Sequence, residues 1–285
     1  PTDEALTADI SRMKKLGFNM LRKHAKIEPE RFYYHCDQLG MLVWQDMVNG
    51  GSAYKHWFVT YLATLMNWNH ISFSDDEKHA GLLSRLHPEG KDEFRREITE
   101  TIAFLYNHPS IVVWVPFNEG WGQFDALAVC EQIRTLDSSR LVDHASGWFD
   151  QKGGDILSLH YYFLKLKFKS ESKRAAALTE FGGYSLSIPG HSCCKKVYGY
   201  KKFNSTGALT YGYIDLIRQT ILPAVKKGIG ATVYTQLSDI EEETNGIYTY
   251  DREICKIDPD TLRKWNRALK EAGECKTYAD HPTDH

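Results

Sequence analysis

The chain has 285 residues, 42% of them hydrophobic and 25% charged, which is enough to bury a large core. Its formal net charge of −2 gives no electrostatic case for nucleic acid or an anionic membrane surface, so neither is expected as a partner. No apolar run approaches the roughly 18 residues typical of a membrane span. The first residues also lack the positive start and apolar core of a signal peptide.

Six cysteines are scattered along the chain, and none forms a Cys-x-x-Cys pair. A chain of this size needs no disulfides to stabilise its core, so free thiols are expected. Free thiols favour a reducing compartment such as the cytoplasm, although a periplasmic or secreted location stays open.

The first part of the chain alternates between helix and strand. Thr7 is the expected N-cap of the first helix, and Gly17 is its expected stop. Helical spacing and short apolar runs predict four elements in order: helix 7–16, strand 18–22, helix 28–39 and strand 41–46. This rhythm is typical of parallel βα units.

Residues 47–90 interrupt the rhythm with a segment that is neither cleanly helical nor of low complexity. It is rich in aromatic residues: Tyr54, Trp57, Phe58, Tyr61, Trp68 and Phe73. An insertion after a strand of this kind lies on the rim where such folds build their sites, and aromatic faces suit the C–H faces of sugars. A packed extra layer of helix explains the same aromatics equally well.

The rest of the chain resumes the alternation. The pattern predicts the following elements: helix 92–106, strand 111–115, helix 124–136, strands 141–145 and 156–160, a strand-like segment within 177–183 that ends at Glu180 and is followed by glycines, loop 182–204, helix 208–227 interrupted at Pro223, strand 229–237, loop 238–251 with an Asn245-Gly246 turn, and helix 260–272. The gap before residue 156 is too short for a helical crossover, so one helix is missing there.

Seven strands are therefore predicted, without sequence repeats. Parallel βα units of this number and length predict an α/β fold, a TIM (β/α)8-type barrel in a single domain over residues 1–285. A closed barrel needs eight strands. Because the chain opens with a helix, the absent strand is the first.

Two glutamates stand at the ends of predicted strands. Glu119 follows strand 111–115 within Asn-Glu-Gly, and Glu180 ends a second strand before two glycines. The loops after the strands form the catalytic rim of such barrels. The alternative for Glu119 is a simple cap of the next helix. Two strand-end carboxylates are what glycoside hydrolysis requires, one as proton donor and one as nucleophile or base.

Several segments together resemble the catalytic barrel of glycoside hydrolase family 2. They are Met13 to Arg22, Cys36 to Val43, His108 to Glu119 and Thr179 to Gly182. In that family the Glu of Asn-Glu, after the fourth strand, is the acid/base and a Glu after the seventh is the nucleophile, which implies these roles for Glu119 and Glu180. The strand count, with the first strand absent, gives the same two positions.

The resemblance has further implications for the organisation of the protein. Family members show a degenerate fifth crossover, which agrees with the short gap before residue 156. β-Sandwich domains usually precede the barrel, and they are absent here together with the first strand. The chain is therefore expected to be a piece of a longer protein, with those upstream domains as partners, and the piece alone is expected to show weak or no activity.

The sequence departs from the family at two positions of interest. The magnesium ligands Glu-x-His of β-galactosidases are not matched by Asp46-Met47-Val48, so no metal is expected, and no other cofactor either. Gln236 stands where many related barrels place a Trp at the end of the eighth strand.

Other candidate substrate-binding residues accompany the two glutamates. Each has a plainer alternative: a turn residue for Asn118, a core histidine for His160, ion pairing inside the barrel for Arg22, His24 and Asp46, and packing for Trp121 and Trp148. Asn118 is positioned to bond a sugar 2-hydroxyl, and Tyr162 to hold the nucleophile ionised. Arg22, His24 and Asp46 are candidates for holding sugar hydroxyls or Glu180.

The predicted function is that of a retaining β-glycosidase acting by double displacement on a carbohydrate substrate. An endo-acting β-glycanase of the same barrel class and a carbohydrate-binding barrel without turnover are the alternatives. Exposed strand edges beside the absent strand also predict association between copies of the chain. The sequence does not identify the sugar.

Overall fold

The computed structural model describes residues 2–53, 55, 57–68, 71, 73–162, 166–194 and 196–277. The chain divides into two compact units, which are described separately below. The first comprises residues 1–11, 19–160 and 171–177, and the second comprises residues 12–18, 161–170 and 178–285. None of the helices in the described ranges is long and apolar enough to cross a membrane.

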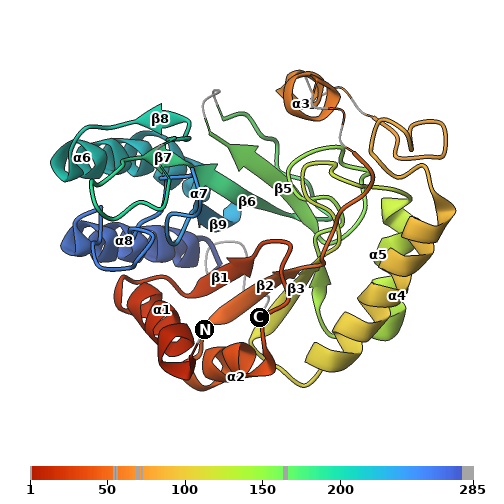
Figure 1. Ribbon diagram of the computed structural model, residues 1–285, viewed down its shortest axis with the longest axis horizontal. Helices are drawn as coiled ribbons and strands as arrows, with labels where there is room; N and C mark the ends of the chain where they lie inside the picture. Colours follow the sequence, from red (N-terminus) through yellow and green to blue (C-terminus); the bar gives the residue numbers. More distant parts are fainter. Residues whose placement is uncertain are drawn as a thin grey trace, which may run out of the picture. The chain divides into compact units, whose positions relative to one another are not determined.

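A four-stranded parallel sheet forms the centre of the first unit. Its order is β1-β2-β3-β4, with β1 at Met20–Lys23, β2 at Leu42–Asp46, β3 at Ile111–Val115 and β4 at Leu141–Val142. Figure 1 shows the first three strands of this sheet. Nearly every residue of β3 is buried, as its continuous apolar run predicts. Because all four strands are parallel, their carboxyl ends meet at one edge of the sheet.

Amphipathic helices cover this sheet. The helix α2 (Glu30–Leu39) ends at Gly40, whose left-handed φ of 64° lets its N–H bond back to the last turn, as predicted. The helices α4 (Pro88–Leu105) and α5 (Ala126–Leu136) lie side by side (Figure 1). α4 buries Phe94, Ile98, Ile102 and Leu105, the face predicted from helical spacing, but it begins four residues earlier than expected because Pro88 fits the first helical turn.

The insertion at 47–90 contains two short helices, η1 (Trp57–Leu62) and α3 (Ala63–Trp68). Phe58, Ala63 and Leu83 form a buried cluster with Phe149, and Trp121 and Trp148 pack against it. Packing therefore accounts for part of the aromatic content. Trp57 and Tyr61 remain largely exposed, while Tyr54 and the side chain of Trp68 lie outside the described part of the chain.

The connection from β4 to β5 (Ile156–Tyr161) contains no helix between residues 143 and 155, which confirms the predicted gap. Polar contacts hold this connection instead. The Asp155 carboxylate accepts from the Val142 N–H (2.8 Å) and from Arg134 (2.9 Å), and Arg174 makes paired bonds to Asp150 (2.7 and 2.9 Å).

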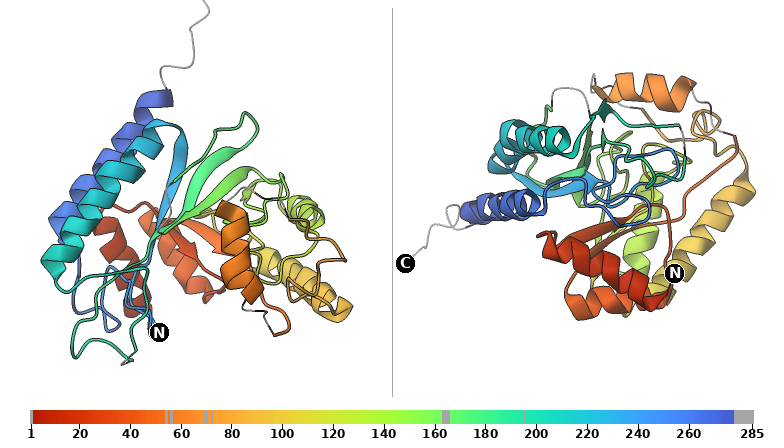
Figure 2. Two further views of the ribbon diagram at one scale, coloured as in Figure 1. Left: turned by 90° about the horizontal axis from the view of Figure 1, so that it is seen from above. Right: turned by 60° about the vertical axis from the view of Figure 1, so that its left-hand side comes forward.

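The second unit contains most of β6 (Ala175–Gly182) and all of β9 (Ile229–Thr235), which are neighbours in one sheet. A short parallel pair, β7 (Tyr184–Ser185) and β8 (Lys201–Lys202), lies within the predicted loop 182–204. The remaining elements are helical (Figure 2): α6 (Thr206–Leu216), η2 (Ile217–Ile221), α7 (Leu222–Lys226) and α8 (Pro259–Thr277). All seven predicted strands are present.

The prediction for the start of the first helix is wrong. The helix α1 spans Asp3–Lys15, and the Thr2 hydroxyl rather than Thr7 accepts the N–H of Ala5 (3.3 Å). Asp3 and Glu4 in the first turn favour this start, because carboxylates stabilise the positive end of a helix.

The predicted Asn245-Gly246 turn is also wrong. The chain reverses at residues 241–242, where Ile240 and Glu243 exchange backbone hydrogen bonds of 3.0 and 2.9 Å. Gly246 instead allows a close approach of two backbones, since a Cβ there would lie 2.2 Å from the Asp239 nitrogen.

Two other predicted boundaries shift. The interruption of helix 208–227 is the π-helical turn η2, which ends two residues before Pro223. Pro223 has no N–H for the carbonyl of Gln219, so the regular helical pattern cannot be kept there. The strand predicted over 141–145 is paired regularly only at Leu141 and Val142, and the polar residues Asp143 and His144 follow it, both buried.

Candidate active site

The Asn118-Glu119 pair follows β3 in a sharply turned backbone. Glu119 has a left-handed φ of 51° and Gly120 a φ of 71°. A left-handed non-glycine residue costs about 1–2 kcal/mol, a kind of strain that concentrates at functional sites. The Glu119 N–H donates to the Ser146 carbonyl (2.9 Å), and a Cβ on Gly120 would overlap the ring of Phe149, so packing fixes this turn.

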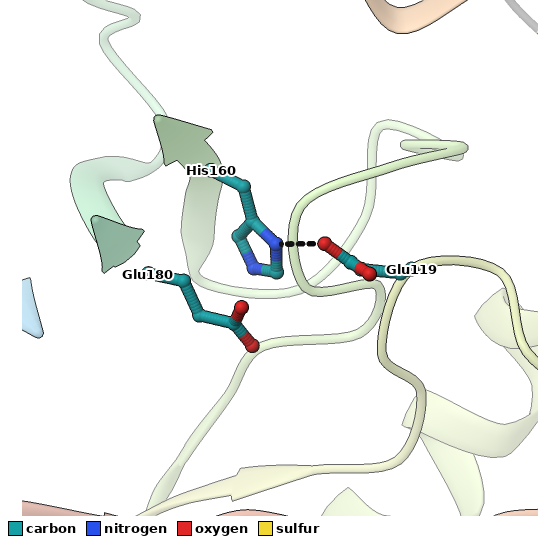
Figure 3. A group of neighbouring side chains, drawn as sticks. All are labelled: Glu119, His160 and Glu180. Carbon is teal, nitrogen blue, oxygen red and sulfur yellow. Dashed lines mark hydrogen bonds and ion pairs between the residues drawn. The ribbon is translucent and has the colours of Figure 1, made fainter. Parts of the chain in front are cut away.

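The Glu119 carboxyl contacts a histidine. Its Oε1 lies 2.7 Å from Nδ1 of His160 (Figure 3), and the other ring nitrogen, Nε2, lies 3.3 Å from the Ser146 hydroxyl. The His160 side chain is 2% exposed and that of Glu119 19% exposed, so the carboxyl is reachable from solvent while its partner is enclosed. Ser146 Oγ also lies 3.2 Å from Ser158 Oγ.

Asn118 is held by a buried ion pair. Arg22 donates to both carboxylate oxygens of Asp46 (3.0 and 2.9 Å) and to Oδ1 of Asn118 (2.8 Å). The Arg22 and Asp46 side chains are each 3% exposed. Burial opposes ionisation of Asp46, but the charge and hydrogen bonds of Arg22 and His24 outweigh burial and lower the pKa of Asp46. Arg22 and Asp46 thus orient Asn118, and sugar contacts of their own stay predictions.

His24 lies at the same edge of the sheet. Its Nδ1 is 3.3 Å from Asp46 Oδ2, and its side chain is 60% exposed. The parallel pairing of β1, β2 and β3 brings these residues together, as their strand-end positions predict.

Glu180 has a different partner, a tyrosine hydroxyl. Tyr162 donates a hydrogen bond to the Glu180 carboxylate and lies 3.2 Å from the hydroxyl of Thr235. Its ring stacks on Tyr200 at 4.1 Å between centroids. A Cβ on Gly183, which has a φ of 62°, would lie 2.5 Å from Tyr200 and 3.0 Å from Tyr162, so this glycine makes room for the pair.

Gln236 follows the end of β9, and its amide nitrogen is engaged with the neighbouring loop. Nε2 donates to Asn245 Oδ1 (2.7 Å) and to Glu243 Oε2 (3.0 Å). Trp148 is half-buried against the aromatic cluster of the insertion, as is Trp121. The proposed sugar contacts of these three side chains stay predictions.

Ser146, Ser158, Tyr200 and Thr235 were not predicted from the sequence. Ser146 could have been found from its position directly after a predicted strand and before Gly147, since a turn glycine after a strand is typical of the catalytic rim. Ser158 shares its strand face with His160 at a spacing of two residues. Tyr200 and Thr235 reach Tyr162 from separate segments and had no local signal.

One group in the second unit has the donor types of a metal site. His191, Asp251 and Glu253 offer ligand atoms within 4.8 Å of one another. The His191–Asp251 contact of 2.6 Å is explained as a hydrogen bond, and Glu253 is 70% exposed. Nothing else in the described residues points to a metal at this place.

Comparisons with known proteins agree with the resemblance seen in the sequence. The family "Glycosyl hydrolases family 2, TIM barrel domain" matches residues 2–220. A β-galactosidase of Leuconostoc mesenteroides is 25% identical over 97% of the chain, which spans 25% of that enzyme. A β-mannosidase B of Thermothelomyces thermophilus is 32% identical over 94 residues, 33% of this chain and 8% of that enzyme.

Solved structures give the same fold. A β-D-glucuronidase of Dictyoglomus thermophilum superposes with a TM-score of 0.64 at 15% identity, covering 94% of this chain and 48% of that one. The chain thus spans a quarter to a half of the length of relatives that it matches along nearly its whole length. The parallel strands and covering helices are those of an α/β barrel domain, and the chain belongs to glycosyl hydrolase family 2, of which it carries the TIM barrel domain.

Proposed function

We propose that the protein is a retaining β-glycosidase in which Glu119 is the acid/base and Glu180 the nucleophile. The contrasting partners of the two carboxyls carry this assignment. Glu119 faces an imidazole, which can hold one oxygen of the carboxyl and leave the other to exchange a proton, whereas Glu180 receives a hydrogen bond from a phenol, which favours the carboxylate. An acid/base gains and loses a proton in each turnover while a nucleophile stays ionised, so the two sets of partners suit these two roles.

In the first step Glu180 attacks the anomeric carbon while Glu119 gives its proton to the departing glycosidic oxygen. This forms a covalent glycosyl-enzyme and releases the alcohol. In the second step Glu119, now ionised, takes a proton from water as the water attacks the anomeric carbon and displaces Glu180. Such a mechanism places the two carboxyls about 5–5.5 Å apart.

Asn118 has the geometry for binding the sugar. Arg22 fixes its Oδ1, which leaves the amide N–H groups as the donors available to a hydroxyl. A bond to the 2-hydroxyl strengthens in the transition state, where it contributes to the rate.

The relatives suggest three sugars as substrates: galactose, mannose and glucuronic acid. We also propose that the natural protein carries further domains before the barrel, since the chain spans 25% of the β-galactosidase. The insertion at 47–90, with Trp57 and Tyr61 exposed, is the proposed edge of the substrate site.

The test is turnover followed by covalent labelling of the full-length protein. A panel of p-nitrophenyl β-D-galactoside, β-D-mannoside and β-D-glucuronide identifies the sugar. A dinitrophenyl 2-deoxy-2-fluoro glycoside of that sugar should then label the peptide that contains Glu180. The fluorine slows both steps, but the good leaving group lets the first step proceed, so the covalent glycosyl-enzyme accumulates. Labelling of Glu119, or of residues 241–243, overturns the assignment.

A further inference from the structure

His160 belongs to a closed ring of contacts around Glu119. The Glu119 backbone N–H donates to the Ser146 carbonyl, the Ser146 hydroxyl contacts His160 Nε2, and His160 Nδ1 contacts the Glu119 carboxyl. Ser146 thus contacts the backbone of Glu119 directly and its carboxyl through the imidazole of His160. Ser146 is itself anchored, since its N–H donates to the Phe117 carbonyl (2.9 Å) and its hydroxyl meets Ser158.

The backbone beside Ser146 is shaped around the imidazole. Gly147 has a φ of 85°, and a Cβ there would lie 2.6 Å from the His160 ring. Ser146 is fully buried, Ser158 is 8% exposed and the His160 side chain is 2% exposed. An enclosed polar chain that ends on one partly exposed carboxyl oxygen orients that carboxyl rather than a substrate.

We propose that His160 is a positioning residue for Glu119, with Ser146 and Ser158 orienting the ring. The proposal replaces a sugar contact of His160 and rests on the proposed function, in which Glu119 is the acid/base.

One tautomer of the ring can serve both forms of the carboxyl. Nδ1–H donates to Oε1 and Nε2 accepts from the Ser146 hydroxyl, whether Glu119 is protonated on its other oxygen, Oε2, or ionised. The ring therefore keeps the carboxyl in one position, and Oε2 is left to give its proton to the departing oxygen.

The consequence is a dependence on the leaving group. Dinitrophenolate departs without a proton, whereas phenolate needs one, so misplacement of Glu119 slows the phenyl glycoside selectively. The measured quantity is the ratio of kcat/KM for the 2,4-dinitrophenyl glycoside to kcat/KM for the phenyl glycoside of the sugar found in the panel. Both values come from one preparation, so the ratio does not depend on the fraction of protein that is folded.

The full-length protein is compared with four variants at His160, Ser146 and His144, and with Glu119→Gln. His160→Ala should raise the ratio by about 100-fold, the effect of a small misplacement of a catalytic group. His160→Asn should raise it less, because the amide still reaches Glu119, and Ser146→Ala should also raise it less. KM should stay unchanged in all three. The matched control is His144→Asn, which removes another fully buried histidine of the first unit, one paired with Asp150; its ratio should equal that of wild type.

The ratio also distinguishes a wrong positioning role for His160 from a wrong acid/base role for Glu119. If it stays at the wild-type value in His160→Ala and Ser146→Ala but rises in Glu119→Gln, the positioning role of His160 is wrong while the acid/base role of Glu119 stands. If Glu119→Gln leaves the ratio unchanged, the acid/base assignment itself is wrong and the positioning proposal falls with it.

Discussion

At the scale of single residues, the two candidate carboxyls differ in what surrounds them. Glu119 stands in a left-handed backbone on a turn fixed by Ser146 and Phe149, and its carboxyl faces an enclosed imidazole. Glu180 lies within the regular strand β6 and receives a phenolic hydrogen bond. Loss of either carboxyl should therefore give different chemistry, not merely less of it.

Glu119→Ala should leave activated aryl glycosides partly cleavable, because a good leaving group departs without an acid. The covalent intermediate should then accumulate, since no base activates water for the second step. Added azide should speed turnover and give the β-azide product, which nuclear magnetic resonance identifies. An α-azide product, or complete loss of activity with no response to azide, would place the acid/base role on another residue.

Tyr162→Phe should lower kcat while the fold is kept, because the ring can still stack on Tyr200. A hydrogen bond to a charged group is worth about 1.5–3 kcal/mol, or roughly 10- to 100-fold in rate. The loss should be similar for phenyl and dinitrophenyl glycosides, unlike that expected for changes around Glu119. Tyr211→Phe, a change at a tyrosine that is 69% exposed, is the control and should retain wild-type kcat. Equal activity of both variants would contradict a role for the Tyr162 hydroxyl.

The sequence pointed to both glutamates and Asn118 because each lies at or shortly after the end of a strand-like run, and strand ends meet at one edge of a parallel sheet. It also suggested Tyr162 as the partner of Glu180, and the hydrogen bond is present. Ser146 could not be predicted as a partner of Glu119. Its position depends on how residues 27 places apart in the chain come together after β3 and β4 pair, which no local pattern encodes.

At the scale of elements, β3 is anchored from outside the sheet. The indole of Trp114 donates to Asp137 (2.9 Å), which also accepts from Arg140 (2.6 Å) and from Ser139. Burial opposes ionisation of Asp137, but these hydrogen bonds outweigh burial and lower its pKa to about 2. The carboxylate thus fixes the strand that carries Glu119.

Asp137→Asn should lower the free energy of unfolding by about 1–3 kcal/mol at pH 7, because buried donors lose their charged acceptor. A carboxyl whose pKa is lower in the folded protein stabilises the fold at pH values above its unfolded pKa of about 3.9. This stabilisation is lost as the pH falls through the pKa of the folded protein. The difference in free energy of unfolding between the variant and wild type should therefore become smaller between pH 4 and about 2, as measured by urea unfolding.

Glu131→Gln is the matched control for Asp137→Asn, because Glu131 is also paired with an arginine but is 71% exposed. Its effect should stay within about 0.5 kcal/mol at every pH. A constant difference between Asp137→Asn and wild type down to pH 3 would show that the Asp137 charge does not stabilise β3.

The types of the elements were predictable from hydrophobic periodicity. The ends of helices and the positions of turns depended instead on which of several suitable residues the fold uses as a cap or in a turn. Thr2 rather than Thr7 caps α1, because the acidic first turn extends the helix toward the N-terminus. Asn245-Gly246 has the composition of a hairpin turn, but the glycine serves a close approach to Asp239. A local pattern cannot show which of two uses of a glycine the fold selects.

At the scale of the whole molecule, the chain matches a domain of proteins that are two to four times longer. In the described residues β1 pairs with β2 only, which leaves its other side at the edge of the four-stranded sheet. β1 carries Arg22, which holds Asn118. We propose that a segment before the chain covers this edge.

Hydrogen exchange tests this proposal. Amides of Met20–Lys23 should exchange more slowly in the full-length protein than in the 285-residue chain, since pairing on a second side satisfies donors that otherwise face solvent. Ile111–Val115, paired on both sides, is the internal control and should show equal protection in both. Equal exchange of Met20–Lys23 in the two proteins would mean that no upstream strand covers β1.

The helix-free connection after β4 has a consequence for how the protein tolerates changes in length. Between residues 146 and 155 the backbone is left-handed at Gly147, Phe149, Lys152 and Gly154, and hydrogen bonds to the carboxylates of Asp150 and Asp155 fix its middle and its end. A helical crossover can gain a residue at its exposed end. This connection is held by contacts along its length, so an added residue would have to displace them. An insertion or deletion here would shift Ser146, and with it the hydroxyl and carbonyl that hold Glu119, so length variation among homologues should be rare at this connection and common in the insertion at 47–90.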